Sequence, residues 1–270
     1  MIPKDFITEW REQAPWVLDR QVEQDLVISR ALVELFSRAE IANALAFRGG
    51  TALYKLHLRP PARYSEDIDL VQTSPGGIGE VLDAIHDALD SWLGAPRWKQ
   101  TDGRVTLSYR FDSEDAPPTP LKLKIEINSR EHFSVHRLRD HRFDVSSRWF
   151  SGSANLRTYE LDELLGTKLR ALYQRKKGRD LFDLAFALEQ GGVDPQRVVD
   201  AFARYIEADG ARVTRAMFER NLAAKRSDAV FKADMSPLLA HGQAWSFEAA
   251  FERVWRELIA RLPGEPWKSG

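Results

Sequence analysis

The chain has 270 residues, of which 43% are hydrophobic and 29% charged, as in a soluble globular protein with one large or two small domains. Its formal net charge of −1 excludes a polycationic, histone-like nucleic-acid binder, and the absence of cysteine excludes a disulfide framework and a thiolate metal site. No stretch approaches the roughly 18 apolar residues of a membrane span and the N-terminus lacks a signal-peptide pattern, so we expect a cytoplasmic protein with no membrane partner.

The first half of the chain alternates helical and strand patterns. Apolar residues at helical spacing predict a helix over residues 16–44, and a short apolar run predicts a strand over 45–47. A helix over 51–57 should end before Pro60, and a strand should follow over 67–73. An amphipathic helix over 81–93 precedes a β region over 97–150, in which residues 121–127 alternate without a fault.

The second half is helical in pattern. We predict helices near residues 160–176, 179–190, 195–208, 212–224 and 246–262. The composition changes near residues 150–158, which predicts an α/β domain over 1–155 and a helical domain over 156–270.

Two features between residues 48 and 71 indicate chemistry. Gly49-Gly50-Thr51 stands between a strand and a helix, where glycine lets the backbone approach an anion and the helix N-terminus offers free N–H groups. Asp67 and Asp69 fall on one side of the next strand, and paired carboxylates are typical Mg²⁺ ligands. A tight turn and a solvated strand face are the structural alternatives for each feature taken alone.

A third feature lies in the predicted helix over residues 160–176. Lys168 falls within its leucine stripe, where the ammonium group either reaches water along its own stem or meets a phosphate group. Gly178 suits a helix C-cap, and Asp180 suits the start of the next helix.

These features together resemble a known motif. Gly49-Gly50-Thr51 followed by Ser65-Glu66-Asp67-Ile68-Asp69-Leu70 resembles the polymerase-beta-type nucleotidyltransferase motif, and more closely that of the AbiEii/AbiGii (MenT-like) nucleotidyltransferase toxins. Lys168 followed by Arg179-Asp180 and Asp183 resembles the later motif of the same family. The resemblance implies an α+β or α/β, bilobal fold, with a polymerase-beta-like mixed sheet flanked by helices and a C-terminal helical bundle.

The resemblance also implies the site residues. The predicted catalytic residues are Asp67, Asp69, Lys168, Asp180 and Glu126. The predicted nucleotide-binding residues are Gly49, Gly50, Thr51, Ser65 and Lys168, and the predicted Mg²⁺ ligands are Asp67 and Asp69. The third carboxylate of such sites is Glu126, Asp112 or Asp180. The basic run itself supplies the candidate RNA-binding residues Arg175, Lys176, Lys177 and Arg179, and it is either a solvated face or a surface that grips a phosphate backbone.

The expected function is Mg²⁺-dependent transfer of a nucleoside monophosphate from an NTP to an acceptor. The resemblance implies a toxin of a toxin–antitoxin pair, with a cognate antitoxin as partner and the 3′ end of tRNA as the RNA acceptor, so that translation stops. The alternatives are a nucleotidyltransferase acting on a small molecule or a protein, a nucleotide-binding module without catalysis, and a kinase-like enzyme that moves the γ-phosphoryl group.

Overall fold

The computed structural model describes residues 2–268, which form two compact units. The first unit holds the chain up to Ser134 together with residues 138–159 and 239–241. The second holds residues 135–137, residues 160–238 and the chain from Gly242 onward. The chain therefore passes between the units several times, and each unit is described here by itself.

A seven-stranded mixed sheet forms the first unit, in the order β3-β4-β5-β2-β1-β7-β6. Its strands are β1 (Leu45–Arg48), β2 (Asp67–Gln72), β3 (Arg97–Thr101), β4 (Arg104–Asp112), β5 (Pro120–Asn128), β6 (Leu138–Ser146) and β7 (Ser151–Tyr159). β2 pairs with β5 and β1 pairs with β7 in parallel, and the other neighbouring strands are antiparallel. The mixed sheet with flanking helices confirms the predicted fold class.

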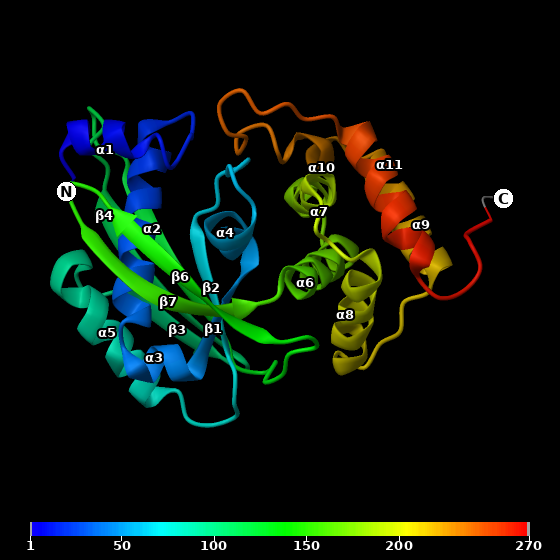
Figure 1. The fold of residues 1–270 in the computed structure, drawn as a ribbon, viewed down its shortest axis with the longest axis horizontal. Helices are drawn as coiled ribbons and strands as arrows, with labels where there is room; N and C mark the ends of the chain where they lie inside the picture. Colours follow the sequence, from blue (N-terminus) through cyan, green and yellow to red (C-terminus); the bar gives the residue numbers. More distant parts are fainter. Residues whose placement is uncertain (1, 269–270) are drawn as a thin grey trace. The chain divides into compact units, whose positions relative to one another are not determined.

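Helices flank the sheet of this unit. They are α1 (Lys4–Trp10), α2 (Asp19–Phe36), α3 (Ala39–Ala44), α4 (Gly49–Ala52), which continues as the π-helical turn η1 (Leu53–His57), and α5 (Gly79–Leu93). α2 lies across the sheet and contacts β5, β7 and β6, while α5 packs beside it against β4 (Figure 1). The hydroxyl group of Tyr109 on β4 donates to Asp90 of α5 at 3.0 Å, which joins the two layers.

The prediction of one helix over residues 16–44 is wrong, because the chain forms two helices there. Ser37 closes α2, and its hydroxyl group donates to the carbonyl oxygen of Val33 at 2.7 Å. Arg38 then adopts an extended backbone, with φ −89° and ψ 125°, before α3 begins. The apolar spacing continues through this break and therefore does not reveal it.

The second unit is built of helices. They are α6 (Leu161–Gln174), α7 (Gly178–Gln190), α8 (Pro195–Ala208), α9 (Arg215–Arg226), α10 (Ala229–Ala233), α11 (Phe247–Glu257) and the 3₁₀ turn η2 (Ile259–Arg261). The five predicted helices are confirmed within a few residues at each end, while the short α10 was not predicted. α6 packs closely on α8, because a Cβ atom at Gly166 would lie 2.5 Å from that of Ala201.

No helix within residues 2–268 combines the length and the apolar character needed to span a membrane.

Candidate functional site

The parallel pairing of β2 with β5 gathers charged side chains on one face of the sheet. Asp67 is in register with Lys124, and Asp69 is in register with Glu126. Side chains of paired strand residues point to the same face, so these four groups form a compact cluster. Ile68 and Ile125, which alternate with them, point into the core and are fully buried.

Lys124 compensates the negative charge of this cluster. Its ammonium nitrogen lies 2.9 Å from a carboxylate oxygen of Asp67 and 3.7 Å from one of Glu126. Burial alone would lower the pKa of Lys124, but its hydrogen bond to Asp67 and the surrounding carboxylate charges raise that pKa above the ordinary value. Lys124 therefore stays charged and holds the Asp67 carboxylate in place.

The backbone at Gly49 packs directly against the Asp69 carboxylate. Gly49 begins α4 with a φ of +82°, in the left-handed region that favours glycine. A Cβ atom at this position would lie only 2.1 Å from Oδ2 of Asp69. The glycine is therefore required by both the backbone conformation and the space that Asp69 occupies.

The second glycine makes room for a buried arginine. A Cβ atom at Gly50 would lie 2.5 Å from Nη2 of Arg63 and 2.9 Å from the hydroxyl oxygen of Ser65. The Arg63 side chain is 2% exposed and donates to the carbonyl oxygen of Tyr64 at 2.9 Å. The two glycines thus let α4 approach the segment that leads into β2.

Thr51 holds α4 close to the segment that leads into β2. Its hydroxyl oxygen lies 2.5 Å from the carbonyl oxygen of Asp67 and 2.9 Å from the hydroxyl oxygen of Ser65. The side chain of Thr51 is buried, so its hydroxyl group is committed to holding the start of α4 against the start of β2.

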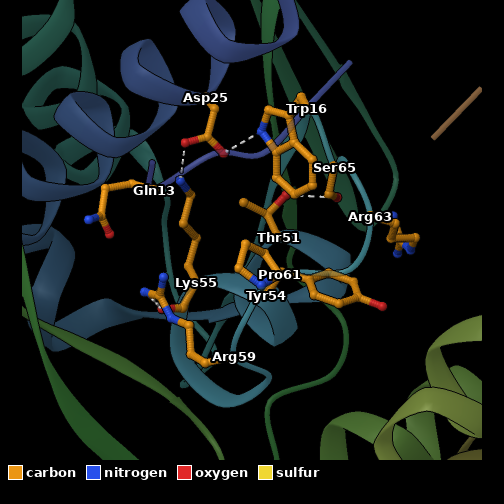
Figure 2. A pocket seen from close by; sticks show the side chains of 10 residues that line it. All are labelled: Gln13, Trp16, Asp25, Thr51, Tyr54, Lys55, Arg59, Pro61, Arg63 and Ser65. Carbon is orange, nitrogen blue, oxygen red and sulfur yellow. Dashed lines mark hydrogen bonds and ion pairs between the residues drawn. The ribbon is translucent and has the colours of Figure 1, made fainter. Parts of the chain in front are cut away.

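A small pocket lies beside α4, and Figure 2 shows Thr51 and Ser65 in its wall with Lys55 and Asp25. The ammonium group of Lys55 donates to Asp25 at 2.6 Å and to Ser29 at 2.8 Å. Asp25 also accepts a hydrogen bond from the indole N–H of Trp16 at 3.2 Å. This buried network anchors the helix that carries the two glycines to α2.

The donor set suits a hard cation that shares its ligands with substrate. The Asp67 and Asp69 carboxylates face one side, and Mg²⁺ typically takes one or two protein carboxylates with phosphate and water oxygens. Within residues 2–268 no cluster of three or more His, Cys, Asp or Glu side chains is close enough to hold a metal ion. Asp67 and Asp69 fit part of the ligand shell of such a cation, and its other ligands would come from outside these two residues.

The register distinguishes two of the candidates for the third carboxylate. Glu126 lies directly opposite Asp69 on the neighbouring strand. Asp112 lies four residues beyond Ser108, the β4 partner of Lys124, which is roughly 13 Å along the strand. The structure therefore brings Glu126 to the pair and does not bring Asp112.

In the second unit, Lys168 lies in a buried ion cluster. Its ammonium nitrogen is 2.9 Å from a carboxylate oxygen of Asp183 and 3.3 Å from one of Asp180, and both aspartates are fully buried. Arg175 also donates to both oxygens of Asp180, at 2.7 and 2.9 Å. Burial alone would raise the pKa of Asp180, but Lys168 and Arg175 hold it below the ordinary value.

The candidate RNA-binding residues of the second unit have acidic neighbours. Lys176 lies 3.1 Å from Asp228, and Arg179 lies 3.9 Å from Asp234. Lys177 lies 3.7 Å from the other oxygen of Asp234. With Arg175 bound to Asp180, each cation of this run has a carboxylate partner within the unit.

Two residues of the site were not predicted. Strand alternation puts Lys124 on the same face as Glu126, but its partner Asp67 lies on a strand far away in the sequence. The burial of Arg63 was not predicted, because a charged residue in a loop is normally exposed to solvent.

The chain resembles one known family of proteins. The sequence profile of the family described as "Nucleotidyl transferase AbiEii toxin, Type IV TA system" matches residues 30–253. No curated protein sequence matches the chain.

Two solved structures resemble the fold. MenT4, a nucleotidyltransferase toxin from Mycobacterium tuberculosis H37Rv, is 19% identical, with a TM-score of 0.70 over 97% of this chain and 91% of that chain. JHP933 from Helicobacter pylori is 18% identical, with a TM-score of 0.52 over 87% of this chain and 89% of that chain.

The profile match covers most of the chain and includes both the Gly-Gly segment and the paired aspartates, while the structures share the sheet and its helices. The chain belongs to the AbiEii family of nucleotidyltransferase toxins of type IV toxin–antitoxin systems.

Proposed function

We propose that this toxin transfers a nucleoside monophosphate from an NTP to an RNA acceptor, the 3′ end of tRNA, and thereby blocks translation. The observation that carries the proposal is the carboxylate pair of β2, with the backbone of Gly49 packed against Asp69. Such a pair beside a helix start suits a triphosphate better than a neutral ligand. The carboxylates bind a metal ion that also binds phosphate oxygens, and the N–H groups of the helix start bind phosphate oxygens directly.

In the proposed reaction, a hydroxyl oxygen of the acceptor attacks the α-phosphorus of the NTP. The bond between the α-phosphorus and its bridging oxygen breaks, pyrophosphate leaves, and the acceptor proton passes to Glu126. Backbone N–H groups of Gly49, Gly50 and Thr51, with the Ser65 hydroxyl, would bind phosphate oxygens. Positioning and charge stabilisation supply most of the rate in this kind of chemistry.

Asp67 and Asp69 would hold Mg²⁺, which supplies Lewis-acid stabilisation of phosphate oxygens when it is bound. Lys124 would then exchange its partner Asp67 for the phosphate or for Glu126, since its ammonium nitrogen already lies near both carboxylates.

The predicted roles in the second half of the chain stay proposals supported by the family motif. In this proposal Lys168 neutralises negative charge on the triphosphate. Asp180 and Asp183 orient the Lys168 side chain through their ion pairs with it. We propose a nucleotidyltransferase domain over 1–155 and a helical domain over 156–270. The two compact units follow this division except at residues 135–137, 156–159 and 239–241. A cognate antitoxin is the expected protein partner.

The test uses purified protein, bulk bacterial tRNA, Mg²⁺ and each of the four α-³²P-labelled NTPs in turn. Label in tRNA-sized RNA with one NTP, with equimolar pyrophosphate, is the expected result. Asp69→Asn should abolish the label, because the amide keeps the shape of the side chain and removes the charge. Asp112→Asn is the matched control and should keep full activity, because that residue lies away from the pair.

Three outcomes would overturn the proposal. Release of NDP in place of pyrophosphate would mark a kinase-like enzyme. Label on a protein or a small molecule, with none on RNA, would change the acceptor. NTP binding without turnover in any of these assays would leave a nucleotide-binding module.

A further inference from the structure

The carboxylate face of the sheet continues sideways into a basic surface. β5 pairs with β4 and β4 with β3, so the rows that begin at Asp67 and Asp69 extend across these strands to the sheet edge. One row passes from Asp69 through Glu126 to Lys99. The other passes from Asp67 through Lys124 to Arg97. Three strand spacings separate the pair from β3, or roughly 14 Å.

The side chains of this surface alternate sharply with the core. Along β4 the inward residues are buried, and the outward residues are exposed or half-buried. All five residues of β3 are exposed. We call the outward cations of the three strands the β3–β5 basic face; they are Arg97, Lys99, Arg104, Arg110, Lys122 and Lys124.

Four of these cations have no acidic partner. Lys124 binds Asp67, and Arg104 lies 3.9 Å from Glu126. The remaining four form no ion pair within the described part of the chain; they are Arg97, Lys99, Arg110 and Lys122. Asp112, at the end of β4, is the exposed carboxylate on the outward face of this strand, so the four unpaired cations leave an excess of positive charge on the face. Such an excess repels itself and is stabilised by a polyanion.

The basic run of the second unit differs in this respect. The carboxylates of Asp180, Asp228 and Asp234 neutralise it, so the gain in binding a phosphate there is offset by the loss of an existing pair. At the four unpaired cations of the β3–β5 basic face, a phosphate can bind without the loss of an existing ion pair.

We propose that the β3–β5 basic face binds the phosphodiester backbone of the acceptor RNA and leads its reactive end to the carboxylate pair. The inference rests on the proposed function for the identity of the acceptor. The contacts are with phosphates, so binding depends on salt and little on base sequence.

The main experiment measures binding of a fluorescein-labelled tRNA transcript by anisotropy across a series of KCl concentrations. The test variant is Arg97→Gln, Lys99→Gln, Arg110→Gln and Lys122→Gln combined in the full chain. It should weaken binding by about tenfold or more and lower the slope of log K against log salt by up to about 3. The KM for tRNA should rise, while kcat at saturating tRNA stays within about twofold.

A smaller test variant combines Arg97→Gln and Lys99→Gln on β3. Its matched control combines Arg212→Gln and Arg220→Gln, which remove the same number of charges. Arg212 and Arg220 are also exposed arginines, and they lie in the second unit. The β3 pair should lower the salt slope by about 1 to 2, and the control pair should leave it unchanged. Circular dichroism should show that all variants fold.

The outcomes separate this inference from the proposed function. Unchanged affinity and KM for tRNA in the fourfold variant, with tRNA labelling intact, would overturn the proposal that the β3–β5 basic face binds RNA. The proposed function would still stand. Equal losses in the β3 pair and the control pair would also overturn it, because net charge alone would explain them. A wild-type protein that never labels RNA would refute the function, and the anisotropy series would still report whether this face binds RNA.

Discussion

At the level of single residues, the site depends on a few close approaches that leave no room for substitution. The backbone of Gly49 lies against Asp69, and that of Gly50 lies against Arg63 and Ser65. The carbonyl oxygen of Asp67 accepts a hydrogen bond from Thr51. The position of the carboxylate pair is therefore linked to the start of α4 through both backbone and side chain.

Replacing Gly49 with alanine should disable the site. The new Cβ atom would meet the Asp69 carboxylate at 2.1 Å, and a φ of +82° is strained for alanine. We expect a loss of roughly 1–3 kcal/mol in the free energy of unfolding and loss of nucleotide transfer. Urea denaturation and the tRNA-labelling assay measure the two effects.

Gly76→Ala is the matched control, because a Cβ atom there has no heavy atom within 4 Å. It should change neither stability nor activity appreciably. A Gly49→Ala enzyme with full activity would show that Asp69 can move without loss of catalysis.

His57 should make stability depend on pH. Burial first, and then the His141 ring 4.8 Å away, lower the pKa of His57 from 6.5 to about 4. Its Nε2 atom has no hydrogen-bond partner within the described residues. Between pH 6.5 and 4 the unfolded chain binds a proton at His57 that the folded chain does not, so acid lowers the free energy of unfolding by up to about 3 kcal/mol.

The measurement is the urea midpoint at several pH values between 4 and 7 for the wild type and His57→Phe. The variant keeps an aromatic ring and removes the titration, so its midpoint should fall less steeply with acid. Parallel curves for the two proteins would show that His57 does not carry the effect.

At the level of elements, sequence patterns predicted the features that neighbouring residues determine, namely the faces of strands and the positions of helices. Period-2 alternation placed Asp67 and Asp69 on one face, and the register of β2 with β5 confirms it. Helical spacing located α6, α7, α8, α9 and α11 within a few residues. Whether the paired carboxylates act as metal ligands stays a prediction.

Non-local partners were beyond the sequence patterns. The pairing of β2 with β5 joins segments 57 residues apart, so Lys124 could not be matched to Asp67. A helical wheel placed Lys168 on the apolar stripe but could not supply its partners, which lie on α7. The break between α2 and α3 lies at Ser37 and Arg38, where the backbone becomes extended, and apolar spacing does not register it.

The ion cluster between α6 and α7 should be a stability element whatever its role in catalysis. Lys168→Met would remove a cation from two fully buried aspartates, Asp180 and Asp183. Breaking one member of such a cluster typically costs about 3–5 kcal/mol, since the remaining charge stays buried. We expect a correspondingly lower urea midpoint for Lys168→Met, measured by far-UV circular dichroism.

Lys168→Arg separates structure from catalysis, because it keeps the charge. Near-normal stability with lost activity would support direct contact with the triphosphate. Near-normal stability with normal activity would limit Lys168 to a positioning role. A Lys168→Met protein as stable as the wild type would contradict the buried-pair argument.

At the level of the whole molecule, the chain order does not follow the two compact units. Residues 239–241 belong to the first unit although they come after α10. Ala240 donates its backbone N–H to Ala62 at 2.9 Å, and His241 donates to Pro15 at 2.9 Å. Leu239 forms a β-bridge with Arg63. A segment from late in the chain therefore holds the loop that leads into β2.

A fragment ending at Tyr159 should consequently fold less stably than the same unit does in the full chain. It keeps all seven strands but leaves the backbone groups of Pro15 and Ala62 without these partners, and each lost hydrogen bond costs about 1 kcal/mol. Hydrogen exchange should show faster exchange across residues 61–65 in the fragment than in the full chain. A synthetic peptide of residues 235–243, added in excess, should slow that exchange again, whereas a scrambled peptide should not. Exchange as slow in the fragment as in the full chain would show that the first unit needs nothing from beyond residue 159, and that the loop before β2 is held by Arg63 and Thr51 alone.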